Sequence, residues 1–91
     1  MRFLLIVALS FVTPSAAPAH QQPGAAAFAN VCEPCHGPQG RGNQGPRLVP
    51  LPKDDEEVLA IVREGFGQMP AISSRELSDE RVREIVAYLK S

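Results

Sequence analysis

The chain has 91 residues and a formal net charge of −1, from 9 Lys/Arg against 10 Asp/Glu. This length leaves room for one domain, and so balanced a charge gives no electrostatic reason to expect a nucleic-acid partner. Only two cysteines occur, Cys32 and Cys35. A large multidomain architecture and a polyanion-binding surface are therefore both disfavoured.

The first 19 residues follow the pattern of an export signal. Arg2 gives a positive start, residues 3–12 are apolar, and residues 17–19 read Ala-Pro-Ala. An apolar run of about ten residues is shorter than the roughly 20 that a membrane-spanning helix needs, so a permanent anchor is the weaker interpretation. We expect cleavage after Ala19, a single mature domain over residues 20–91, and a periplasmic or otherwise exported location.

The mature part is small for a domain that must bury its own core. Removing 19 of the 91 residues leaves 72, a size at which a disulfide, metal or cofactor usually supplements the hydrophobic core. That part keeps eight Lys/Arg against ten Asp/Glu, a polypeptide charge of −2. The sequence thus predicts that something other than side chains completes the core.

Three segments predict helices. Residues 25–32 are rich in Ala, the best helix former, and contain no breaker. Asp54 is placed to cap a helix over Asp55–Glu64 and Ser78 one over Asp79–Lys90, and both segments repeat apolar residues at helical spacing. No alternating strand pattern or internal repeat occurs. We therefore predict an all-α fold of three main helices.

A long segment between the first two helices is irregular. Residues 37–52 hold four glycines and four prolines, a density that argues against any regular element. A structureless segment of 16 residues is unusual in so small a domain. Such a loop is understandable if it wraps over a buried object that is not protein.

Residues 32–36 read Cys-Glu-Pro-Cys-His, the attachment signature of c-type haem. Two thiols three residues apart on a helical turn project to one side. Cys32 and Cys35 would form thioethers with the two vinyl groups, and His36 would bind the iron. The motif predicts one covalently bound haem c per chain and makes that haem the missing part of the core.

Three other uses of the cysteines are less favoured. A structural zinc site needs about four ligands, and this chain offers only Cys32, Cys35, His36 and His20. A thioredoxin-like redox pair belongs in a βαβ context, which the helical pattern does not provide. A disulfide would close a very small loop and could not supply the missing core.

The second axial ligand of the iron should come from the second half of the mature chain. Met69 is the only methionine there, in the loop segment Gly-Phe-Gly-Gln-Met-Pro over residues 65–70. A methionine inside a helical stripe usually fills a gap in the core, but a Gly/Pro loop favours ligation. His20 is a weaker candidate, because the first residue of a polar terminus is usually solvated.

Four motifs stand in the order found in a known family. They are Cys-Glu-Pro-Cys-His-Gly (32–37), Gly-Pro-Arg-Leu (45–48), Gly-Gln-Met-Pro-Ala (67–71) and Val-Ala-Tyr-Leu (86–89). The chain thereby resembles the class I c-type cytochromes, and most closely their small bacterial single-haem members and subunits. The resemblance covers nearly all of the mature chain and implies a cytochrome c-like fold, with loops wrapped around one haem.

The resemblance also implies two contacts. Gly24 and Phe28 of the first helix would cross the last helix near Tyr88. The backbone carbonyl of Pro46 would accept a hydrogen bond from the ring nitrogen of His36 that faces away from the iron, and would so orient the imidazole.

With His36 and Met69 both bound, the iron has no open position, so outer-sphere electron transfer is the remaining chemistry. We expect an electron carrier with a positive potential, not an enzyme. It would be a monomer that meets redox partners through a small transient interface. Arg41, Arg47 and Gln68 are candidate contacts at the rim of that interface.

Two other functions stay open. The chain could be a haem subunit bound permanently to a periplasmic dehydrogenase or terminal oxidase. A gas or redox sensor would require Met69 to leave the iron, and the sequence supplies no output module.

Overall fold

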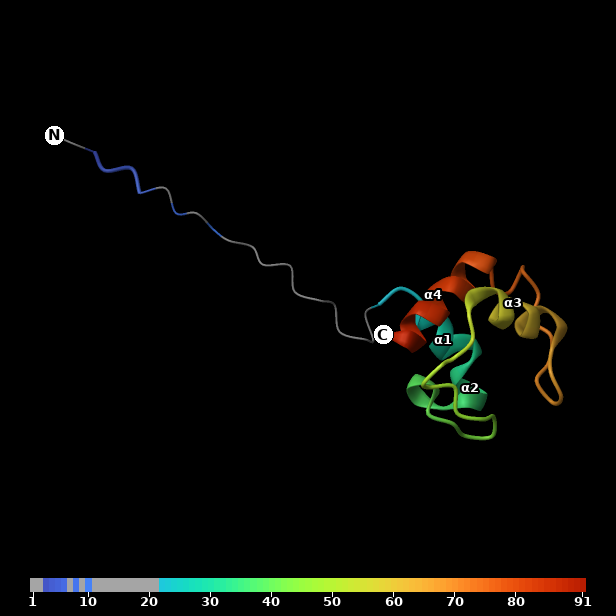
Figure 1. The fold of residues 1–91 in the computed structure, drawn as a ribbon. Coiled ribbons are helices and arrows are strands. Elements are labelled where there is room, and N and C mark those ends of the chain that lie inside the picture. Colours follow the sequence, from blue (N-terminus) through green and yellow to red (C-terminus); the bar gives the residue numbers. More distant parts are fainter. Residues whose placement is uncertain (1–2, 7, 9, 11–21) are drawn as a thin grey trace.

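This computed structural model describes residues 3–6, 8, 10 and 22–91. Its elements, in chain order, are α1 (Ala25–Val31), α2 (Glu33–His36), the short 3-10 turn η2 (Pro38–Gly40), α3 (Asp55–Glu64) and α4 (Asp79–Lys90) (Figure 1). Within the described part of the chain the only bridge of strand type is an isolated one between Phe66 and Met69. The predicted all-α class is confirmed.

The long loop contains the short turn η2, which is not a regular helix, because Gln39 at its centre has a left-handed φ of 58° and Gly40 ends it at φ 72°. Apart from this turn, the loop is irregular as predicted. The expected first helix divides at Cys32, where α1 ends and α2 begins. The remainder of residues 37–52 has no further helix or strand.

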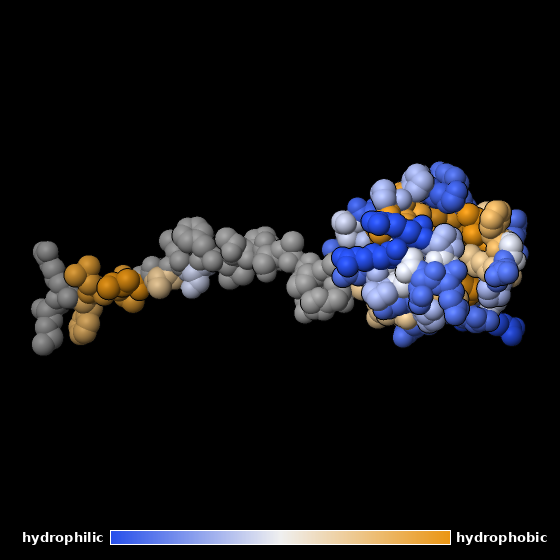
Figure 2. Space-filling model, turned by 90° about the horizontal axis from the view of Figure 1, so that it is seen from below, coloured by the Kyte–Doolittle hydropathy of each residue, from blue (hydrophilic) through white to orange (hydrophobic). Residues whose placement is uncertain are grey.

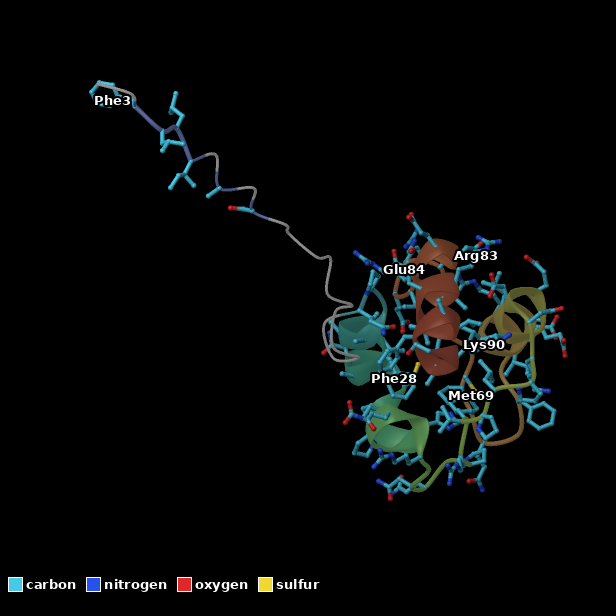
Figure 3. The ribbon with its side chains drawn as sticks, turned by 60° about the vertical axis from the view of Figure 1, so that its left-hand side comes forward. Phe3, Phe28, Met69, Arg83, Glu84 and Lys90 are labelled. Carbon is cyan, nitrogen blue, oxygen red and sulfur yellow. The ribbon has the colours of Figure 1, made fainter. Side chains whose placement is uncertain are left out.

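The crossing of α1 with α4 ties the two ends of the domain together (Figure 1). Gly24, the N-cap of α1, has φ 90° and lies so close to α4 that an added Cβ would clash with the carbonyl of Glu84. The rings of Phe28 and Tyr88 meet at a centroid distance of 5.7 Å. Figure 3 shows Glu84 on the side of α4 that faces α1. The contacts implied for these residues are therefore present.

Helix α3 packs against the other side of α4. Asp54 and Glu57 form the predicted capping box, with Asp54 Oδ1 accepting from the Glu57 N–H at 2.9 Å. An ion pair of 3.3 Å between Arg83 and Glu56 joins the two helices, and Arg83 points toward α3 in Figure 3. The local signals thus place both helices where the core requires them.

The core is small and is built around Phe28, which is 1% exposed. Six other buried apolar side chains from α3, α4 and the segment between them complete it: Leu59, Val62, Leu77, Val82, Ile85 and Leu89. Around this cluster lie apolar side chains that are only partly buried, several of them on the loops between α2 and α3 and between α3 and α4. The side chains alone leave the loop side of the core incompletely covered.

Most of the expected export signal lies outside the described residues, including the proposed cleavage site at Ala19 and the following His20. The described residues 3–6 have no regular secondary structure, and their apolar side chains are almost fully exposed (orange at one end of Figure 2). Across the described ranges, none of the helices has the length and apolarity to cross a bilayer. The boundary at residue 20 stays a prediction.

Replacing Ser78 with alanine should lower the free energy of unfolding by about 1 kcal/mol. Ser78 Oγ accepts a hydrogen bond from the Arg81 N–H at 3.2 Å and so satisfies a free donor at the start of α4. Urea unfolding followed by circular dichroism measures the change. Ser74→Ala, at an exposed serine outside the helix, is the control and should stay within about 0.5 kcal/mol of the wild type. Equal losses in the two variants would contradict the capping role.

Candidate functional site

The two cysteines lie at the junction of α1 and α2. Cys32 is both the C-cap of α1 and the N-cap of α2. Its carbonyl oxygen accepts hydrogen bonds from the N–H groups of Cys35 and His36, at 3.2 and 2.9 Å. This turn holds Cys32 half-buried against the core, while Cys35 is exposed. The local backbone therefore places both thiols and the imidazole on a single short turn.

Neither cysteine thiol is joined in a disulfide. Burial raises the pKa of the Cys32 thiol to about 11, whereas reactive redox cysteines usually have a lowered pKa. Among the residues that the structure describes, no group of three or more His, Cys, Asp or Glu side chains could hold a metal ion. None of these observations favours zinc, a disulfide or a thioredoxin-like pair.

His36 is oriented by the loop that follows it. Its Nδ1 lies 2.8 Å from the carbonyl oxygen of Pro46. A carbonyl can only accept, so Nδ1 carries the proton and donates it, and the lone pair of Nε2 is left for another partner. The ring also packs closely on Gly45, where an added Cβ would lie 3.1 Å from both Cε1 and Nδ1 of His36. This geometry is what an axial histidine ligand needs.

Met69 lies at the end of a tight turn between α3 and α4. The N–H of Phe66 donates to the Met69 carbonyl at 3.1 Å, and the Met69 N–H donates to the Phe66 carbonyl at 2.9 Å. Gly65 and Gly67 have φ angles of 77° and 56°, which favour glycine. The Met69 side chain is partly buried against the core cluster, and Figure 3 shows it beyond the Lys90 end of α4.

The apolar side chains around these residues fit a large apolar group. Phe66 is 76% exposed, and Figure 2 shows hydrophobic residues reaching the surface on one side of the domain. Six apolar side chains are only partly buried against the core on the loops and the start of α3: Leu48, Val49, Leu51, Val58, Met69 and Ile72. Exposed apolar groups in one region mark a binding surface. Together with free thiols on one turn and an oriented imidazole, they fit a haem.

The structure brings most of the predicted site residues together. Cys32, Cys35 and His36 share one turn and Pro46 contacts that turn directly, whereas Met69 is linked to this group only by packing against the same core cluster as Cys32. The three rim candidates, Arg41, Arg47 and Gln68, are all exposed. Arg41 and Arg47 line a hollow beside the end of α4 rather than the surroundings of Met69. The packing of Gly45 against the His36 ring was not predicted from the sequence. The position of Gly45 directly before Pro46 could have indicated it.

Residues 19–89 match the family described as cytochrome C oxidase, cbb3-type, subunit III. The chain belongs to this family. It is a class I c-type cytochrome domain that transfers electrons on haem c, so the recognition made from the four motifs is confirmed. The interpretation of this cytochrome domain as an electron carrier rather than an enzyme is likewise confirmed.

Two curated relatives are cytochrome c subunits of larger complexes. The cytochrome bc1 complex cytochrome c subunit of Corynebacterium diphtheriae is 32% identical over 78 residues, 81% of this chain and 28% of the relative. The menaquinol:cytochrome c reductase cytochrome c subunit of Geobacillus thermodenitrificans is 46% identical over 44 residues, 48% of this chain and 18% of the relative. The chain therefore spans under a third of the length of either relative. No solved structure matches it.

Proposed function

We propose that this cytochrome domain carries one haem, bound covalently through Cys32 and Cys35 with His36 and Met69 as axial ligands, and passes single electrons outside the cytoplasmic membrane. The observation that carries the proposal is the 2.8 Å contact between His36 Nδ1 and the Pro46 carbonyl. This contact leaves the lone pair of His36 Nε2 free to bind iron, on the same turn that holds both thiols. When bound, the haem supplies the one-electron redox chemistry.

The side chains of this chain then have distinct roles. The Pro46 carbonyl holds the proton on Nδ1 and increases the basicity of Nε2. The thioether sulfur of Met69 is a soft ligand, which favours the reduced state and raises the potential. His36 and Met69 would together leave oxygen and substrates no coordination site on a bound haem, so the chemistry that the haem would supply is outer-sphere electron transfer. The sulfur ligand is therefore the feature that supports a carrier with a positive potential.

The exported location rests on the leader pattern of the first 19 residues, with Arg2 as a positive start, an apolar run over residues 3–12 and Ala-Pro-Ala at residues 17–19. An apolar run at residues 3–6, exposed almost fully in water, is understandable in a segment that is removed on export. The amino-terminal sequence of the purified holoprotein tests this point, and a start near residue 20 is expected.

Covalent attachment is tested by denaturing the holoprotein in alkaline pyridine and recording its reduced spectrum. The wild type should give the band of a haem with both vinyl groups saturated, and the haem should stay with the polypeptide in acid acetone. Cys35→Ser should keep one thioether and shift the band, and the double replacement of Cys32 and Cys35 should lose covalent haem. Release of haem from the wild type into acid acetone would contradict the attachment.

A second candidate function is a haem domain held permanently in a respiratory complex. It is favoured by the two relatives, whose names describe subunits of a bc1 complex and of a menaquinol:cytochrome c reductase. Gel filtration of the native extract, followed by haem absorbance, distinguishes the two. A free carrier should elute as a small monomer. Elution in constant ratio with quinol-oxidising or oxidase subunits would instead establish the permanent complex.

A further inference from the structure

Arg63, in the last turn of α3, is joined to two different parts of the chain. Its Nη1 donates to the carbonyl oxygen of Ile72 at 3.2 Å, and its Nη2 pairs with Asp79 Oδ1 at 2.5 Å. The Arg63 side chain is only 24% exposed. Ile72 ends the loop that begins at Gly65, and Asp79 is the first residue of α4. One guanidinium therefore connects α3, the methionine loop and α4.

The methionine loop, defined here as residues 65–72, packs Met69 and Ile72 against the core but has few other hydrogen bonds to the rest of the domain, one of them from the Gly65 N–H to the Ile61 carbonyl at 2.8 Å. Its internal turn, between Phe66 and Met69, fixes the local shape of the loop but not its position. The Ile72 N–H donates to the Val62 carbonyl at 2.7 Å and anchors one end. Gly65 begins the loop at φ 77°, against the Met69 carbonyl. The hydrogen bond from the charged guanidinium of Arg63 to the Ile72 carbonyl reinforces the attachment at this end of the loop.

We propose that Arg63 is a positioning residue that holds Met69 in place for the iron by fastening the methionine loop to α3 and α4. The proposal rests on the ligation of iron by Met69 proposed above. A guanidinium suits the task because its planar fork can serve two acceptors in fixed directions. Lysine, with a single ammonium, would not reproduce both contacts with the same geometry. Arg63 does not touch Met69 itself and acts through the backbone at Ile72.

The chain offers a matched control for this proposal. Arg83 also joins α3 to α4, through an ion pair of 3.3 Å with Glu56, but in the described structure it makes no hydrogen bond or ion pair with the methionine loop. Both arginines therefore contribute to the packing of the two helices. Only Arg63 should affect the release of Met69, so a comparison of Arg63→Gln with Arg83→Gln separates positioning from general stability.

The test is a titration of the ferric holoprotein with imidazole at neutral pH, followed by the change of the main haem absorption band in every variant and, in those that keep Met69, by loss of the near-infrared sulfur-to-iron band. Imidazole must displace Met69, so its apparent affinity reports how firmly the loop holds the sulfur. Arg63→Gln should bind imidazole about tenfold more tightly than the wild type, as expected for one lost hydrogen bond to a charged group. Arg63→Lys and Asp79→Asn should show smaller increases. Arg83→Gln should stay within about twofold, because its pair with Glu56 is exposed and joins the same two helices without the loop.

The outcomes separate this proposal from the one on which it rests. Wild-type imidazole affinity in Arg63→Gln, combined with tighter binding in Met69→Ala, overturns the positioning role and leaves Met69 as the ligand. Unchanged imidazole affinity in Met69→Ala overturns both, because no sulfur is then being displaced. Equal increases in Arg63→Gln and Arg83→Gln also overturn positioning in favour of general loosening. If Arg63→Gln fails to fold, the same comparisons apply to Arg63→Lys and Asp79→Asn.

Discussion

Replacement of Met69 by alanine is expected to abolish the weak near-infrared band of the ferric protein that arises from sulfur bound to iron. The structure holds the Met69 side chain partly buried against the core, at the end of a turn closed by two backbone hydrogen bonds. Alanine keeps the turn but removes the soft ligand. The reduction potential should therefore fall, on the order of 0.1 V within the roughly 0.8 V range that axial ligands control. Near-infrared absorption and a redox titration measure the two effects.

Gln68→Ala is the control for this replacement. Gln68 is the exposed neighbour of Met69 in the same turn, so its loss tests whether a change in the loop is enough to alter the spectrum. The band should persist in Gln68→Ala and its potential should stay close to that of the wild type. A band that survives in Met69→Ala would refute the sulfur ligand and with it the sealed, six-coordinate site.

The parts of the fold that were predictable from sequence depend on local signals. The capping box of Asp54 and Glu57 is completed within four residues, and the side chain of Ser78 caps α4 in the same local way. These signals set the starts of α3 and α4 at the predicted residues. The attachment motif is also local, because one helical turn carries Cys32 through His36. Short-range chemistry of this kind can be read from the sequence without knowledge of the tertiary structure.

The features that were missed depend on contacts between distant parts of the chain. Arg63 sits in an ordinary last turn of a helix, and nothing in its neighbourhood indicates that its guanidinium meets residues 9 and 16 positions away. The position of η2 could not be predicted either, because its shape depends on the left-handed conformation of Gln39, a residue that rarely adopts it. The close packing of Gly45 on the imidazole likewise depends on how the loop folds back. Only the assembled domain shows these relations.

Replacement of Gly24 by alanine is expected to lower the free energy of unfolding by about 3 kcal/mol. Two effects add at this position. The φ angle of 90° is unfavourable for a residue with a Cβ, and the added Cβ would clash with the backbone of Glu84 and Ile85. Relief would require α1 to move away from α4, which would also separate Phe28 from Tyr88. Because α1 leads directly into the turn that bears the thiols, haem attachment during maturation should also become less efficient. Urea unfolding and the haem-to-protein ratio measure these losses.

Gly67→Ala separates the two effects. Gly67 also has a positive φ, 56°, but no atom lies within 4 Å of the position that its Cβ would occupy. This variant should therefore lose only the conformational part, about 1 kcal/mol. A loss of stability in Gly24→Ala no larger than that in Gly67→Ala would mean that α4 accommodates the added methyl group at no cost in free energy. The close approach of α1 to α4 would then not be the reason for glycine at position 24. A clearly larger loss would show that the helix crossing demands glycine at this position, and a lower haem-to-protein ratio beside it would show that haem attachment depends on a contact at the far end of α1.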